Sequence, residues 1–224
     1  MPTLSFSEFS AAELLLLRQG MQLLQQCEEI AAIGAQIFEK QEKEPGKILQ
    51  VLRELWMPRL EALKPCGDDG RVDSSEQFLL VPGGWNGSDQ GSSTVMHIVE
   101  RTGPDEDSFV TCNTGPGLEY HPSDASCPPK LRYKTCIRLD NIPRERMEDA
   151  GFWTMMFTLW MRAPPSPMHR VEMLYDVLLP WLAGATLPAQ LARTAEDKCS
   201  AWRTPQRSGT SAWRAVAESL RYAL

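Results

Sequence analysis

The chain has 224 residues, of which 42% are hydrophobic and 23% are charged, and its formal net charge is −6 at pH 7. This composition is typical of a globular protein that buries a sizeable core, and it excludes a chain that is largely disordered. The excess of acidic residues disfavours nucleic acid as a partner, because such binding depends on Lys and Arg side chains that neutralise phosphates.

Other features bear on the compartment and on bound groups. The longest apolar runs, at residues 14–17 and 152–161, are shorter than the roughly 20 residues that a bilayer crossing requires. The N-terminus lacks the basic segment of a secretory signal. No two of the six cysteines form a C-x-x-C pair, so free thiols are expected rather than a metal or redox centre. We therefore predict a cytoplasmic protein with no membrane partner, no cofactor and no metal.

The first predicted element is a long helix that begins after Ser10. Ser10 and Glu13 have the spacing of a capping box, in which each side chain hydrogen-bonds to a backbone amide at the start of a helix. Apolar residues then recur at every third or fourth position from Leu14 to Phe38, which indicates one buried stripe. Pro45 and the glycine after it are expected to end this helix.

A second helical pattern covers residues 48–63, with a bend expected at Pro58. Together the two helices predict an antiparallel hairpin. The turn-forming residues 64–70 then indicate a boundary in the chain. We therefore predict two units, a helical hairpin at residues 1–70 and an α+β domain at residues 71–224.

The central part of the chain consists of short segments that are rich in β-branched and aromatic residues and are separated by Gly, Pro and Asp. Four strands are predicted, at residues 78–81, 94–100, 108–112 and 132–139. Residues 103–107 are expected to form the hairpin turn between the second and third strands. This region therefore predicts a central antiparallel sheet.

Helical periodicity then returns at residues 147–159 and 171–181, and the prolines within residues 164–167 separate these two helices. The segment 152–161 is apolar on nearly every side, which predicts a buried helix or one whose second face meets a partner. A last amphipathic helix begins near Ser211. The order of helices, sheet and helices predicts an α+β fold.

The start of the last helix bears most directly on function. A tight turn places Ser211 in the first helical turn, where the backbone amides and the helix dipole would lower the pKa of a cysteine. A serine hydroxyl gains too little from the same field and needs a general base beside it. The alternative is that Thr210 or Ser211 is an ordinary N-cap.

Residues 208–215 resemble the nucleophile box of ovarian-tumour-type deubiquitinases, which reads Asp-Gly-Asn-Cys followed by an apolar residue, an aromatic residue, Arg and Ala. The resemblance places Ser211 at the position of the catalytic cysteine, and Ser208 and Thr210 at the positions of the aspartate and the asparagine. The positions that agree with the family pattern are Gly209, Trp213, Arg214 and Ala215. The resemblance implies a papain-like cysteine hydrolase in which oxygen stands where the catalytic sulfur would be.

The central segment has a second resemblance. Residues 81–85 and 109–121 resemble a segment of large protist and bacterial proteins that carry it ahead of a cysteine-peptidase box. This similarity extends over residues 77–183. It implies that the chain resembles the N-terminal part of a longer hydrolase. The deubiquitinase resemblance implies ubiquitin or another protein as the partner.

A hydrolase of this type needs a histidine base, and the candidates are His97, His121 and His169. His97 is in phase with Val95 and Val99 on a predicted strand, so its ring is expected to share their face. It is the base that a permuted order of catalytic residues would use. The alternative is a packed histidine without a chemical role.

Two other features have structural interpretations. Cys199 precedes an Ala-Trp-Arg stretch like the one that follows Ser211, but the acidic residues before it would raise its pKa, so a structural cysteine is expected. The glycines of residues 113–117 are expected to form a turn rather than a phosphate-binding loop, because no helix start follows them.

These patterns predict a catalytically inactive or truncated relative of a deubiquitinase-like cysteine hydrolase, which acts by binding protein. The rival hypothesis is a helical interaction or scaffold module, in which residues 10–63 dock a partner and the sheet is structural. A third hypothesis is an active permuted hydrolase, papain-like or ubiquitin-specific, that uses Ser211 and His97.

Overall fold

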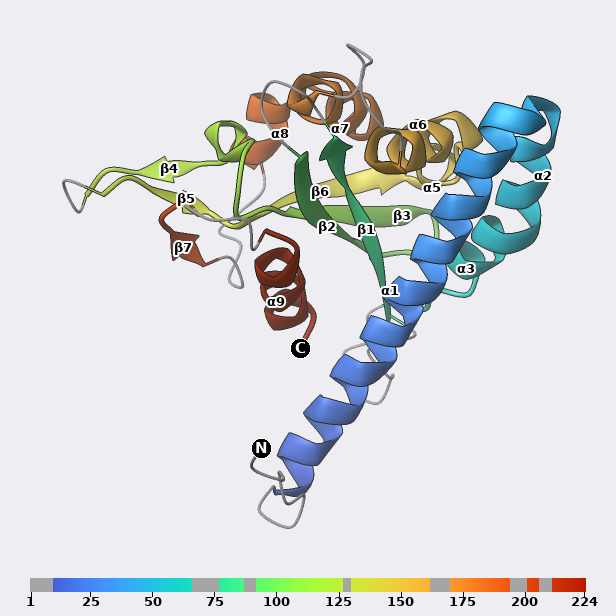
Figure 1. The fold of residues 1–224 in the computed structure, drawn as a ribbon. Coiled ribbons are helices and arrows are strands. Elements are labelled where there is room, and N and C mark those ends of the chain that lie inside the picture. Colours follow the sequence, from blue (N-terminus) through green and yellow to red (C-terminus); the bar gives the residue numbers. More distant parts are fainter. Residues whose placement is uncertain are drawn as a thin grey trace.

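The structure is a computed structural model, and it describes residues 10–65, 77–86, 92–126, 130–161, 170–193, 201–205 and 211–224. A four-stranded sheet lies at its centre, and a second sheet of three short strands lies beside it. Figure 1 shows α6 (Ala150–Met161) and α7 (Leu179–Ala183) on one side of the central sheet and α9 (Ser211–Ala223) on the other. The long helix α1 (Ala11–Lys43) packs along the edge strand β1. The predicted α+β fold is confirmed.

The N-terminal helices form the predicted hairpin. Helix α1 begins directly after Ser10 and ends before Pro45, and Figure 1 shows the chain returning alongside its C-terminal half. The return path consists of η2 (Pro45–Lys47), α2 (Ile48–Val51), the π-helical turn η3 (Leu52–Trp56) and α3 (Met57–Glu61). The wide π turn ends at Trp56, two positions before Pro58, which has no N–H to donate to the carbonyl four residues earlier.

The central sheet has the strand order β1-β2-β3-β6, and every neighbouring pair is antiparallel. Its strands are β1 (Phe78–Asn86), β2 (Ser92–Arg101), β3 (Glu106–Cys112) and β6 (Cys136–Pro143). The first three strands and the turn at residues 103–107 lie where the sequence predicts them.

The fourth predicted strand, residues 132–139, is divided in the structure between the two sheets. Its first part is β5 (Arg132–Lys134), which pairs with β4 (Ser123–Asp124) and β7 (Trp202–Arg203). Its second part belongs to β6. Between them the Thr135 amide donates to the Ala201 carbonyl over 3.0 Å, and the Thr135 carbonyl accepts from the Asn113 amide over 2.8 Å. The chain therefore changes sheets at Thr135.

The predicted helices after the sheet are also present. Residues 147–159 correspond mainly to α6, and residues 171–181 to a helix that includes η5 and α7. The remaining short helices are η4 (Leu118–Tyr120), α5 (Arg144–Met147), η5 (Met173–Leu178) and α8 (Leu187–Arg193). Phe152, Trp153 and Phe157 of α6 are buried, which favours the core interpretation of this apolar helix.

Alternate residues of β2 face two separate hydrophobic clusters. Val95 belongs to the larger cluster, together with Trp153 of α6. Met96 belongs to the smaller cluster, together with Ala215 of α9. Because successive side chains of a strand point to opposite faces, α6 and α9 cover opposite faces of the central sheet.

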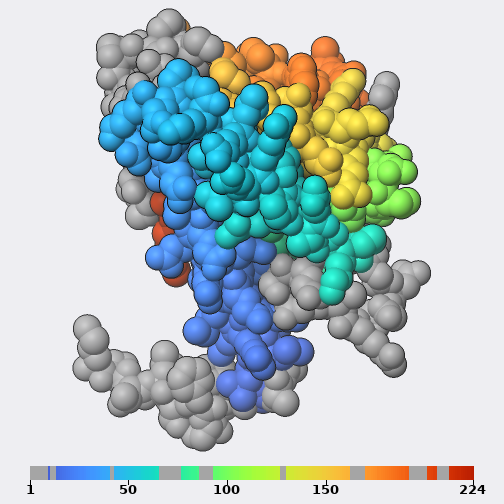
Figure 2. All heavy atoms as spheres, turned by 90° about the vertical axis from the view of Figure 1, so that its right-hand side faces the viewer, coloured from blue at the N-terminus to red at the C-terminus, as the bar shows by residue number. Residues whose placement is uncertain are grey.

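The helices of the predicted N-terminal unit contribute to the same core as the sheet. Ile30 and Ile37 of α1 and Trp56 of η3 belong to the larger cluster, and the Trp56 ring centroid lies 4.4 Å from that of Trp153. Figure 2 shows α1, α2 and α3 (blue to cyan) lying against this flank, with the N-terminal part of α1 extending beyond it. The predicted boundary near residue 70 lies outside the described residues and stays a prediction.

Candidate functional site

His97 is a fully buried residue of β2. Its Nδ1 atom lies 3.1 Å from the hydroxyl oxygen of Thr111 on β3, and its ring centroid lies 5.0 Å from that of Phe109. A Cβ atom at Gly83 would lie only 2.5 Å from His97 Nε2, so β1 leaves no space beside the ring. Burial lowers the pKa of His97 to about 3. This histidine is neutral and packed within the core at neutral pH.

The sheet separates His97 from the helix that begins with Ser211. His97 is in phase with Val95 and therefore points to the face that α6 covers. Helix α9 packs on the opposite face, where Ala215 contacts the cluster that contains Met96. The side chain of Ser211 lies outside the described part of the structure, but its helix is on the other side of the sheet from His97. The structure does not bring the two predicted catalytic positions to one face.

His121 takes part in a buried hydrogen-bond network. Its Nδ1 atom lies 2.8 Å from the Lys134 carbonyl, which can only accept, so Nδ1 carries the proton. Its Nε2 atom accepts from the Tyr175 hydroxyl over 2.9 Å, and Asn113 Nδ2 donates to the same hydroxyl over 3.0 Å. Burial lowers the pKa of His121 to about 4, against a smaller opposing effect of the Lys134 carbonyl. The network joins η5 to the loop that follows β3.

Several predicted residues lie outside the described residues and keep their status as predictions. These are His169, Cys199, Ser208, Gly209 and Thr210. Of the predicted nucleophile box, Trp213 is 74% exposed and Arg214 is exposed, whereas Ala215 is buried against the sheet. Helix α9 begins at Ser211, which is compatible with a cap at this point of the chain.

Residues 113–117 form the predicted turn. Asn113 Oδ1 accepts from the Gly115 amide over 2.9 Å, and Asn113 Nδ2 donates to the Pro116 carbonyl over 2.7 Å. Gly117 has a φ of 89°, a left-handed conformation that favours glycine. The turn holds Thr114 at the end of β3, close to α9 and the second sheet.

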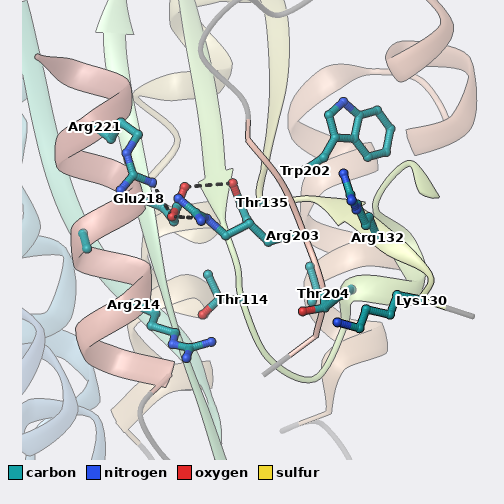
Figure 3. Close-up of a pocket in the computed structure, with 12 residues that line it drawn as sticks. Thr114, Lys130, Arg132, Thr135, Trp202, Arg203, Thr204, Arg214, Glu218 and Arg221 are labelled. Atoms are coloured by element: carbon teal, nitrogen blue, oxygen red, sulfur yellow. Dashed lines mark hydrogen bonds and ion pairs between the residues drawn. The ribbon is translucent and has the colours of Figure 1, made fainter. Parts of the chain in front are cut away.

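A pocket of about 570 Å³ lies between α9, the second sheet and this turn (Figure 3). Its charged lining side chains, which define the basic pocket, are Lys130, Arg132, Arg203, Arg214, Arg221 and Glu218. Arg214 and Arg221 come from α9, and the other cations come from β5, β7 and the residue two positions before β5. Among the residues that the structure describes, the lining has five cationic side chains and one carboxylate, although the whole chain carries a net charge of −6.

Glu218 is the acidic centre of the basic pocket and is only 7% exposed. Its Oε1 atom accepts from Arg203 Nε over 2.8 Å and from Arg221 Nη1 over 2.5 Å. Its Oε2 atom lies 3.2 Å from the hydroxyl oxygen of Thr135, the residue at which the chain changes sheets. Glu218 therefore ties α9 to β7 and to the junction of the two sheets, as the dashed lines in Figure 3 show.

The basic pocket was not predicted from the sequence. Its residues come from segments that are more than 80 positions apart, such as Lys130 and Arg214. One signal was present in α9, because Arg214, Glu218 and Arg221 are four and three positions apart and so lie on one helical face. That spacing indicates a charged face but does not show which strand it meets.

Comparison of the chain with protein-family models, with curated proteins and with solved structures found no match. Its function is therefore inferred from its own residues. Among the helices that the structure describes, none combines the length and the apolar character needed to cross a membrane.

Proposed function

We propose that the chain acts by binding a protein and does not hydrolyse it. The observation that carries this proposal is the position of His97, which is buried on the face of the sheet opposite to α9. A serine at the start of α9 needs a general base within hydrogen-bonding distance. Among the described residues, the cluster under α9 that contains Met96 and Val110 includes no histidine, and the Glu100 carboxylate on this face is paired with Arg138.

The resemblance of residues 208–215 to a deubiquitinase nucleophile box makes ubiquitin the first partner to test. Isotope-labelled ubiquitin would be titrated with the unlabelled chain and followed by NMR. We expect concentration-dependent shifts in a continuous patch of ubiquitin resonances. The absence of shifts at high concentration would contradict ubiquitin as the partner.

Hydrolysis is tested separately with a fluorogenic ubiquitin conjugate. We expect no turnover by the chain, and no difference between the chain and its Ser211→Ala variant. Turnover that disappears in Ser211→Ala would overturn the proposal, because a serine nucleophile would then have a base that the geometry does not provide. If turnover is seen, a His97→Gln variant tests whether the buried histidine is the base.

A second candidate is the interaction module, and the surface of α1 favours it. Leu17 and Met21 of α1 are 43% and 70% exposed, and both line one apolar groove on this helix. Exposed apolar side chains that lie close together commonly mark contacts with another protein. Under this candidate ubiquitin gives no shifts. If ubiquitin does bind, a Met21→Glu variant decides whether α1 provides the contact.

A further inference from the structure

We infer that the basic pocket binds a small molecule that carries two or more phosphate groups, an activity separate from the proposed protein binding. The described part of the lining places five cations around the Glu218 carboxylate in a chain that is acidic overall. Bringing like charges together costs free energy, and an anion bound between them would offset that cost. This concentration of charge is the first reason to expect an anionic ligand.

The ion pairs of the basic pocket leave positive charge uncompensated. Glu218 accepts from both Arg203 and Arg221, so one carboxylate faces two guanidinium groups. Among the described residues, Lys130 and Arg214 take part in no ion pair. Three or more positive charges are thus available to a ligand, which is more than a single carboxylate or chloride would neutralise.

Arg132 has a weak electrostatic neighbour in Asp124. The pKa of Asp124 is lowered mainly by hydrogen bonds from the amide and the hydroxyl of Ser126, and Arg132 contributes less. No ion pair joins Arg132 to Asp124. Its guanidinium group therefore remains able to bind a phosphate in the bidentate geometry that Arg favours.

The arrangement of the side chains suits a ligand that extends across the basic pocket. Figure 3 shows Arg214 on α9 and Lys130 on the opposite wall, with the charged ends of both directed toward the space between them. The hydroxyl group of Thr204 lies between these two walls and can donate to phosphate oxygens. A volume of about 570 Å³ is within the range of small-molecule sites, which is roughly 300–1,000 Å³.

Trp202 distinguishes two sources of the phosphate groups. Its indole ring is 41% exposed and lies on the wall that carries Arg132. A nucleoside polyphosphate could stack its base on this ring, because base–aromatic stacking is worth about 1–3 kcal/mol. An inorganic polyphosphate or a phosphorylated alcohol would use the cations alone.

The test is isothermal titration calorimetry of the full chain with sodium tripolyphosphate and, separately, with a nucleoside triphosphate. We expect binding to both that weakens as salt is added. The Arg214→Gln variant should weaken both by about tenfold or more, because it removes charge-assisted hydrogen bonds to phosphate. The matched control is Arg53→Gln, since Arg53 is exposed on η3.

Two further variants complete the design. Lys130→Gln should lower the affinity for both ligands, as Arg214→Gln does. Neither substitution should change the thermal unfolding midpoint, because neither residue takes part in an ion pair among the described residues. If a base stacks on Trp202, the Trp202→Ala variant should bind the nucleoside triphosphate more weakly and tripolyphosphate unchanged. If its affinity for the nucleoside triphosphate is also unchanged, the ligand is held by its phosphate groups alone. Either result supports the site.

The inference is overturned by any of three results. One is the absence of binding to both ligands at millimolar concentration and low salt. Another is an equal effect of Arg214→Gln and Arg53→Gln, which would indicate non-specific attraction. The third is binding of an oligonucleotide without binding of tripolyphosphate, which would identify the surface as a nucleic-acid site.

Discussion

The Tyr175 hydroxyl donates to His121 Nε2 across 2.9 Å, and this bond joins a helix to a loop 54 residues earlier in the chain. The same hydroxyl accepts from Asn113 Nδ2, so its donor and its acceptor are both used inside the core. Asn113 also shapes the turn that carries Thr114 into the basic pocket. Tyr175 therefore supports one wall of the basic pocket from within the core.

Tyr175→Phe should destabilise the protein by about 1–3 kcal/mol, because it leaves His121 Nε2 buried without a donor. The ring and its stacking on Tyr120 would remain. Urea unfolding followed by circular dichroism measures the change in the free energy of unfolding. Tyr133→Phe is the control, since Tyr133 is only half-buried on β5, and its value should lie near zero.

Stability should fall as the pH is lowered below about 6.5. Burial lowers the folded-state pKa of His97 to about 3 and that of His121 to about 4, whereas an unfolded histidine titrates near 6.5. Between these values the unfolded chain binds more protons than the folded chain. The free energy of unfolding therefore decreases as the pH is lowered, by up to about 1.4 kcal/mol per pH unit for each histidine. Chemical unfolding at a series of pH values from 7.5 to about 5 measures this slope.

The matched variant for the pH experiment is His97→Gln, which removes one of the two titrating groups. Its stability should be lower than that of the parent at neutral pH, but its dependence on pH should be weaker. A slope that is unchanged in this variant would show that His97 does not contribute.

The sequence predicted those elements whose signal is local. The apolar stripe from Leu14 to Phe38 and the alternation around His97 required only residues that are close together in the chain. The division at Thr135 depended on pairing with Ala201, 66 residues later, while residues 132–139 read as one uninterrupted strand. Pairing between distant segments has no local signal.

The candidate site shows the same limit. The alternation of β2 placed His97 on the same face as Val95, but it could not show which helix covers that face. The opposite face is covered by α9, the helix that begins with Ser211. The basic pocket depends on α9 meeting β5 and β7, which are separate in the sequence.

Gly83→Ala should destabilise the protein through a direct clash with His97. The added Cβ would lie 2.5 Å from Nε2 and 2.7 Å from Cδ2 of the imidazole ring, which is packed against Phe109 and cannot move freely. Overpacking of a core by one methyl group costs about 1–3 kcal/mol. Thermal unfolding provides the measurement, with Gly46→Ala as the control because no atom lies within 4 Å of a Cβ at Gly46. Equal midpoints for the two variants would contradict the packing of His97 described above.

Glu218→Gln should loosen the contact of α9 with the second sheet. The carboxylate is nearly buried, but its partners Arg203 and Arg221 are about half exposed, so solvent screens part of the interaction and the expected loss is about 1–3 kcal/mol. The control is Glu61→Gln, which changes an exposed carboxylate at the end of α3. Hydrogen exchange followed by mass spectrometry should show faster exchange in α9 for Glu218→Gln and no change there for Glu61→Gln. The same substitution removes the negative charge of Glu218 from the basic pocket, so tripolyphosphate should stabilise Glu218→Gln by more than it stabilises the parent. If added tripolyphosphate left the unfolding midpoints of parent and variant equally unchanged, Glu218 would hold the sheets together without any relation to an anionic ligand.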